Sequence, residues 1–254
     1  MPVLPGAEAF RFDGGHVGVL LCHGFTGSPQ SLRPWGEQLA AAGLRVQCPR
    51  LPGHGPRWQE LNLTRWQDWY AEIAHSFDDL VGRCDQVFVM GLSMGGTLAL
   101  RLAERRPDEV AGLVLVNPSV LSKNRALALL PVLKWVVPSR PGVGNDIKRE
   151  GVTELAYDRT PLRAAHSLAH LWKLVRDDLS AVVAPLLIFR SIDDHIVEPE
   201  NSEVVLAGVS SEQKEERLLR HSYHVATLDN DADEIFTGSI DFVRAHARAA
   251  SGGG

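Results

Sequence analysis

The chain has 254 residues, 44% of them hydrophobic, which suits a single globular domain with a large buried core. A formal net charge of -5, with acidic and basic residues interspersed, excludes the basic surface of a nucleic-acid-binding protein and a polybasic membrane patch. We expect a cytoplasmic protein, because three cysteines suit reduced thiols, the first residues lack a secretory signal, and no apolar run reaches the ~18 residues of a membrane-spanning helix.

Strands and helices alternate along the first half of the chain. Apolar runs typical of buried strands lie at residues 16–22, 44–48, 87–89 and 110–116. Between them, apolar residues at helical spacing predict one helix over residues 32–42 and another after Thr64, whose hydroxyl is positioned to cap it. This alternation predicts an α/β fold with a mostly parallel central sheet flanked by helices.

The alternation stops in the middle of the chain and resumes near its end. Residues 118–180 show helical patches and turns without a clear strand. Strands are predicted again at residues 184–190 and 216–219, and a last helix at 231–249. The predicted division is a core of residues 1–117 and 181–250, a cap or lid inserted before the last strands at 118–180, and a disordered tail at 251–254.

The predicted insertion contains one unusually apolar segment. Residues 126–137 are apolar on nearly every side of a helix, with an interruption at Pro131. A surface helix would have one polar face, so this segment either packs on both sides or exposes an apolar surface to a lipid-like substrate or an interface. Further along, Glu150 and Glu154 are one helical turn apart and are expected on a solvated face.

The motif GLSMG at residues 91–95 lies between a predicted strand and a predicted helix, the context of the nucleophile elbow of α/β-hydrolases. Glycines on both sides of Ser93 allow the strained turn that such an elbow requires. The turn would expose the Ser93 hydroxyl and place the amide of Met94 at the positive end of a helix, where it can stabilise an oxyanion. The alternative is a tight turn that contains a serine by chance.

Three further segments fit the same chemistry. The loop that begins at His23 offers the amide of Phe25 as a second oxyanion donor. An acidic residue follows the strand at 184–190, where the third member of a Ser-Asp-His triad belongs, and spacing does not decide between Asp193 and Asp194. His224 follows the last strand, at the place of the general base.

Two other histidines are not expected to be the base, and His54 is assigned a structural role. His54 lies in a loop rich in proline and glycine, and His195 directly follows the two aspartates, so its side chain is expected to diverge from theirs.

Taken together, these segments resemble the bacterial monoacylglycerol lipases of the α/β-hydrolase fold and, more distantly, small carboxylesterases. The similarity covers residues 17–246. It is closest in HGFTGSPQS (23–31), CDQVFVMGLSMGG (84–96), GNDIKREGVTELAY (144–157), DDHIV (193–197) and SYHVATLDND (222–231).

The resemblance implies a triad of Ser93 as nucleophile, His224 as general base and Asp194 as the acid, with the oxyanion held by the amides of Phe25 and Met94.

The resemblance also implies how the substrate's alcohol is recognised. Glu154 would bind the glycerol hydroxyls, and Val143 would contact the polar end of the substrate.

The function implied is hydrolysis of monoacylglycerols to glycerol and a free fatty acid through an acyl-enzyme, without a metal or organic cofactor. The expected partner is a monoacylglycerol or another small lipid ester, with transient contact of the cap with a membrane or micelle and no nucleic acid. The alternatives are a short- or medium-chain carboxylesterase without glycerol selectivity and a ligand-binding protein on a hydrolase scaffold.

Overall fold

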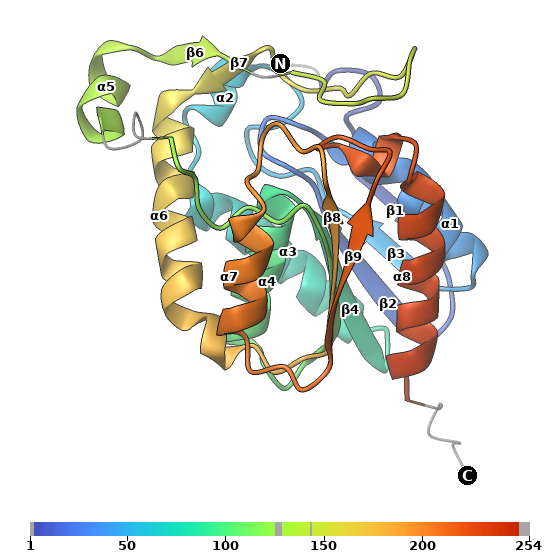
Figure 1. Ribbon diagram of the computed structural model, residues 1–254. Coiled ribbons are helices and arrows are strands. Elements are labelled where there is room, and N and C mark those ends of the chain that lie inside the picture. Colours follow the sequence, from blue (N-terminus) through green and yellow to red (C-terminus); the bar gives the residue numbers. More distant parts are fainter. Residues whose placement is uncertain (1–2, 125–128, 143, 249–254) are drawn as a thin grey trace.

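The computed structural model describes residues 3–124, 129–142 and 144–248, and its centre is a seven-stranded sheet (Figure 1). The strand order is β1-β3-β2-β4-β5-β8-β9, and every neighbouring pair is parallel except β1 with β3. The strands are β1 (Phe10–Phe12), β2 (Val17–Cys22), β3 (Arg45–Cys48), β4 (Gln86–Leu92), β5 (Val110–Val116), β8 (Leu186–Ser191) and β9 (Lys214–Leu219). The predicted mostly parallel sheet flanked by helices is confirmed.

Helices cover both faces of the sheet (Figure 1). One face packs against α1 and α8, and the other against α3, α4 and α6. The α-helices are α1 (Arg33–Ala41), α2 (Trp58–Leu61), α3 (Trp66–Val81), α4 (Met94–Arg105), α5 (Leu130–Val136), α6 (Leu162–Asp178), α7 (Glu200–Gly208) and α8 (Ala232–His246). Short 3-10 helices are η1 (Pro29–Leu32), η3 (Leu179–Ala181) and η4 (Ala226–Leu228).

The two hydrophobic cores follow directly from the alternation of side chains along the strands. In β4, Val87 and Val89 point into the core under α3 and α4, whereas Phe88 and Met90 point into the core under α1 and α8. Because both faces of β4 are buried, its sequence is apolar without interruption, and the same reason explains the apolar run of β5.

The structure contains strands that the sequence pattern missed. β1 is a three-residue antiparallel edge strand. The insertion, predicted to lack strands, contains the two-stranded pair β6 (Ser139–Pro141) and β7 (Arg159–Pro161), so that prediction is wrong. Strands of three residues are too short to show the alternation on which a sequence-based assignment depends.

The prediction that the Thr64 hydroxyl caps the N-terminus of a helix is also wrong. Helix α3 begins at Trp66, and the carboxylate of Asp68 accepts the N–H of Arg65 at 3.0 Å. The Thr64 hydroxyl instead donates to the carbonyl of Leu61 at 2.9 Å and accepts the indole N–H of Trp69 at 2.9 Å.

The inserted residues 118–180 include elements in two parts of the fold. Helix α6 packs against α3 and α4 and so belongs to the layer that covers the sheet, whereas α5 and the β6–β7 pair lie toward one end of the molecule (Figure 1). The separate cap therefore stays a prediction.

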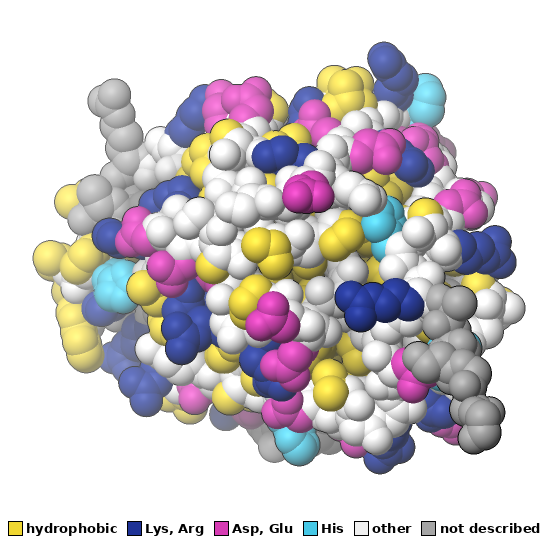
Figure 2. Space-filling view, turned by 90° about the horizontal axis from the view of Figure 1, so that it is seen from below, with side chains coloured by type: hydrophobic (Ala, Val, Ile, Leu, Met, Phe, Trp, Pro, Cys, Tyr) yellow, Lys and Arg dark blue, Asp and Glu magenta, His cyan; other side chains and the backbone are white. Residues whose placement is uncertain are grey.

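Charges are mixed on the face of the molecule that Figure 2 shows. Figure 2 shows lysine and arginine side chains interspersed with aspartate and glutamate on one face. Within the described ranges, no helix combines the length and the apolar character that crossing a bilayer requires.

The turn between β4 and α4 forces three pieces of backbone together. Ser93 has φ 55° and ψ -118°, in the region that non-glycine residues rarely adopt. A Cβ at Gly95 would lie 1.8 Å from the carbonyl oxygen of Cys22, and a Cβ at Gly91 would lie 2.3 Å from the backbone of Gly95. Both glycines of the motif are therefore required by close contact of β2, β4 and α4.

Gly95→Ala is expected to lower the free energy of unfolding by about 3 kcal/mol or more, because neither backbone can move away without disrupting the sheet. The matched control is Gly82→Ala at the end of α3, where φ is -68° and a Cβ would meet its nearest atom at 3.5 Å. This change should stay within about 1 kcal/mol of wild type. Urea unfolding measures both, and equal midpoints for the two variants would contradict the crowding at the elbow.

Candidate active site

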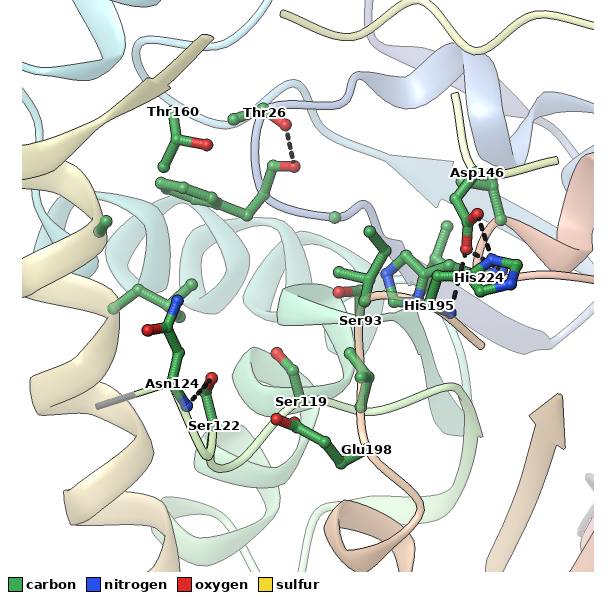
Figure 3. Close-up of a pocket in the computed structure, with 18 of the residues that line it drawn as sticks. Thr26, Ser93, Ser119, Ser122, Asn124, Asp146, Thr160, His195, Glu198 and His224 are labelled. Carbon is green, nitrogen blue, oxygen red and sulfur yellow. Dashed lines mark hydrogen bonds and ion pairs between the residues drawn. The ribbon is translucent and has the colours of Figure 1, made fainter. Parts of the chain in front are cut away.

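A pocket of about 600 Å³ lies beyond the carboxyl ends of the central strands (Figure 3). Its wall includes Ser93 after β4, Ser119 after β5, Val197 after β8 and His224 after β9. Ligands of parallel α/β sheets bind at this edge, because successive strands all end there and their loops converge. The sequence analysis predicted the site residues at these strand ends.

Ser93 reaches the pocket because of the strained turn described above. Its backbone N–H donates to the carbonyl of Val116 at 3.0 Å, which ties the turn to the end of β5. Only 9% of the residue is exposed. Figure 3 shows Ser93 in the pocket wall, with His224, His195 and Asp146 toward the same end.

His224 and Asp194 form a hydrogen-bonded pair beside Ser93. Nδ1–H of His224 donates to Oδ2 of Asp194 at 2.8 Å. The other carboxylate oxygen accepts the N–H groups of Ile196 and Val197, each at 2.8 Å, which fixes the orientation of the carboxylate. Asp193 points elsewhere and lies 3.4 Å from Nζ of Lys148, so the structure brings Asp194 to the imidazole.

Each member of the pair shifts the pKa of the other in the direction that favours its charged form. Burial lowers the pKa of His224, but the negative charge and hydrogen bond of Asp194, together with the charges of Glu154 and Asp146, outweigh it and the pKa is raised above its usual 6.5. Burial raises the pKa of Asp194, yet His224 and the amides of Val197 and Ile196 bring that pKa below its usual 3.8. Asp194 therefore remains ionised, and the imidazole can accept a proton in a site shielded from water.

Two backbone amides close to Ser93 have no competing partner among the described residues. No described residue accepts a hydrogen bond from the N–H of Phe25 or of Met94, the first residue of α4. A Cβ placed at Gly24 would lie 3.6 Å from Cβ of Ser93, so the loop of Phe25 runs beside the serine. Such a pair of free amides is suited to hold an oxyanion.

His23 anchors this loop, a role that the sequence analysis did not assign. Nδ1–H donates to the carbonyl of Gly24 at 3.0 Å, and Nε2 accepts the N–H of Leu51 at 3.1 Å. This pattern requires the neutral imidazole, and burial lowers the pKa of His23 to about 4. His54, predicted to be structural, is buried with its ring 4.9 Å from that of His23.

Glu154 lines the same pocket, although the prediction that it shares a helical face with Glu150 is wrong. Both residues lie in the irregular segment 144–158, before β7; Glu150 is exposed, as expected. Oε1 of Glu154 packs against Gly27, where a Cβ would lie only 2.6 Å away. Burial raises the pKa of Glu154 to about 7, and the nearby His224 acts in the opposite direction. Val143 lies outside the described residues.

Asn117 is a further residue that the sequence analysis missed. It follows β5 with a φ of 44°, and its Nδ2 donates to the carbonyl of His224 at 2.8 Å and to Oγ of Ser191 at 3.0 Å. Its Oδ1 accepts the N–H of Ser191 at 2.7 Å. Asn117 thus joins the ends of β5 and β8 to the loop of His224.

The described residues contain no group of three or more His, Cys, Asp or Glu side chains placed to hold a metal ion.

Comparison with known proteins matches this chain to a family. Residues 16–231 match the Hydrolase_4 family, described as serine aminopeptidase, S33. A thermostable monoacylglycerol lipase from Bacillus sp. (strain H-257) is 43% identical over 251 residues, covering 97% of this chain and 98% of that protein. A carboxylesterase from Bacillus subtilis (strain 168) is 26% identical over 237 residues, covering 93% and 96%.

Solved structures show the same similarity. A structure from the work on LipS and LipT, two metagenome-derived lipolytic enzymes, has a TM-score of 0.94 and 43% identity, and covers 96% of this chain and 100% of that chain. The monoacylglycerol lipase of Paleococcus ferrophilus has a TM-score of 0.80 with 97% and 100% coverage; at 21% identity it shows the shared fold alone.

Proposed function

The chain belongs to the Hydrolase_4 family, and we propose that it is a serine hydrolase that cleaves monoacylglycerols to glycerol and a free fatty acid. The observation that carries the proposal is that Ser93, the hydrogen-bonded pair His224–Asp194 and Glu154 belong to one site, with Ser93, His224 and Glu154 in the wall of one pocket. The close relationship to a monoacylglycerol lipase over nearly the whole chain supports the choice of substrate.

The reaction begins with attack of the Ser93 hydroxyl on the ester carbonyl. Nε2 of His224 takes the hydroxyl proton, while the hydrogen bond from Nδ1–H to Asp194 holds the imidazole in the required tautomer and stabilises the imidazolium. The negative charge that develops on the carbonyl oxygen is stabilised by the amides of Phe25 and Met94.

Collapse of the tetrahedral intermediate releases the alcohol. The imidazolium of His224 donates its proton to the departing glycerol oxygen, which leaves the acyl group on Ser93. His224 then removes a proton from water, water attacks the acyl carbonyl, and the fatty acid leaves with Ser93 restored.

The pocket has regions suited to both parts of a monoacylglycerol. Leu121, Leu168 and Trp172 offer apolar surface for the acyl chain. Glu154 and Asn145 offer polar groups near His224, where the alcohol leaves. When ionised, the half-buried Glu154 carboxylate can accept hydrogen bonds from two free hydroxyls, and a charged acceptor with little access to water favours an alcohol that supplies them.

A carboxylesterase without glycerol selectivity is the second candidate. The apolar part of the pocket would accept the acyl chain of many esters, and the relative from Bacillus subtilis is a carboxylesterase. The two candidates differ only in whether Glu154 recognises the alcohol.

Glu154→Ala should lower kcat/KM for monolauroylglycerol by about 10-fold to 100-fold, because hydrogen bonds from the glycerol hydroxyls to a charged acceptor are lost. Turnover of methyl laurate, which has no free hydroxyl, should change far less. Glu150→Ala, an exposed residue of the same segment, should leave both rates unchanged. Equal losses on the two substrates after Glu154→Ala would favour the carboxylesterase.

The exposed apolar face of α5 supports transient contact with a membrane or micelle as part of the proposed function. Val132, Trp135 and Val136 are 69%, 70% and 78% exposed, so packing of this helix on both sides is excluded for these residues. The guanidinium of Arg163 lies 5.1 Å from the ring centroid of Trp135, and Lys134 is on the same helix. Apolar side chains flanked by cations are typical of surfaces that bind at a lipid interface.

Val136→Asp should weaken sedimentation of the protein with vesicles that contain anionic lipid by about 10-fold, because a charge replaces an apolar side chain at the interface. Hydrolysis of a soluble short-chain aryl ester should not change. Val183→Asp, at a 49% exposed position before β8, is the matched control and should leave vesicle binding intact. The same effect from both variants would show that contact is not made through α5.

A further inference from the structure

Asp146 is a pocket residue that the proposed reaction leaves without a role. It lies between β6 and β7 beside Asn145, and its side chain is only 11% exposed (Figure 3). A carboxylate with so little contact with water needs hydrogen-bond donors around it. The identity of these donors indicates what the residue does.

Among the described residues, the donors to Asp146 come from the loops that carry His224 and Asp194. Oδ2 accepts the backbone N–H of His224 at 3.0 Å and that of His195 at 3.3 Å, and Oδ1 accepts from Nδ1 of His195 at 2.8 Å. The main-chain carbonyl of Asp146 accepts the N–H of Val225 at 3.1 Å. One residue therefore holds two consecutive amides of the segment that presents the imidazole.

The neighbour of Asp146 connects to the other part of the site. Oδ1 of Asn145 accepts the backbone N–H of Glu154 at 2.7 Å, and its Nδ2 donates to the carbonyl of Val152 at 3.4 Å. Asn145 has φ 56°, a conformation that asparagine tolerates better than most residues. Residues 145 and 146 thus form a direct bridge from the backbone of Glu154 to the backbone of His224.

We propose that Asp146 is a positioning residue that fixes the imidazole of His224 relative to Glu154 and adds a negative charge to its surroundings. The inference rests on the proposed function only in taking His224 as the general base. This bridge holds His224, which protonates the departing alcohol, in a fixed position relative to Glu154, which recognises that alcohol. Errors of about 1 Å in such geometry reduce rates up to about 100-fold.

Asp229 provides a comparison with a purely structural carboxylate. It accepts the backbone N–H groups of Lys148 at 2.7 Å, Arg149 at 2.9 Å and Tyr223 at 2.9 Å, so it joins the same two segments of the chain. It is 1% exposed and does not line the pocket. Loss of Asp229 should therefore affect stability without changing the charge that faces the imidazole.

Because Asp146 adds a negative charge near His224, it affects the pKa of that imidazole, which a purely structural residue would not do. Burial lowers the pKa of His224, and the negative charges of Asp194, Glu154 and Asp146 raise it. His195, which is exposed, is the neighbouring group that becomes cationic. The base must be neutral to act, so the acidic limb of the rate profile follows its pKa. Removal of a negative charge lowers this pKa and moves the limb to lower pH.

The test is the pH profile of kcat/KM between about pH 5 and pH 9 with p-nitrophenyl laurate, a substrate without glycerol hydroxyls. Asp146→Asn should move the acidic limb down by about half a pH unit and lower kcat by about 10-fold. Asp229→Asn should lower the melting temperature without moving the limb, and Asp193→Asn, a nearby exposed carboxylate, should change neither. A limb of Asp146→Asn that coincides with wild type would overturn the proposal.

His195→Gln keeps the proposal testable if Asp146→Asn does not fold. His195 is 55% exposed, so its replacement should be tolerated, and loss of the cation beside Asp146 should move the acidic limb to higher pH. If the acidic limb of His195→Gln coincides with that of wild type, the proposed role of Asp146 is contradicted. Wild-type turnover of monolauroylglycerol in the same assay tests the proposed function separately, because the aryl-ester profile does not depend on glycerol recognition.

Discussion

The hydrogen bond between Asp194 and His224 is the interaction on which the arrangement of the site depends. It joins the loop after β8 to the loop after β9, and each partner is itself held by other groups: Asp194 by two backbone amides, and His224 by Asn117 and Asp146. An isolated imidazole would rotate and exchange its proton with water. Here its orientation, tautomer and charge are all set by groups buried with it.

The sheet brings these groups together because its parallel strands end at one edge. The serine approaches the same place only because two glycines allow the backbones of β2, β4 and α4 to touch. The strained turn at Ser93 is thus stabilised by the surrounding sheet, while the inserted segment adds Glu154 and Asp146 to the wall of the same pocket. The proposed nucleophile, base and alcohol-binding groups come from separate parts of the chain.

The sequence predicted those parts of the fold and site that depend on local patterns. The apolar run of β5 was placed at residues 110–116, as observed, because both of its faces are buried. Ser93 was predicted because it directly follows a strand, and His224 because it lies in the loop between the last strand and the last helix. The choice of Asp194 over Asp193 depended on resemblance, since two adjacent aspartates give the same local signal, and only the fold shows which one meets the imidazole. Asp146 could not be predicted, because its carboxylate accepts the backbone N–H of His224, 78 residues away in the chain.

The most direct test of this account is the reaction of the protein with a fluorophosphonate, followed by mass spectrometry of its peptides. The account predicts a single adduct on Ser93 and a rate of labelling that falls at least about 100-fold in His224→Gln, because the hydroxyl then has no base. An adduct on another residue, or equal labelling rates in the two proteins, would contradict it.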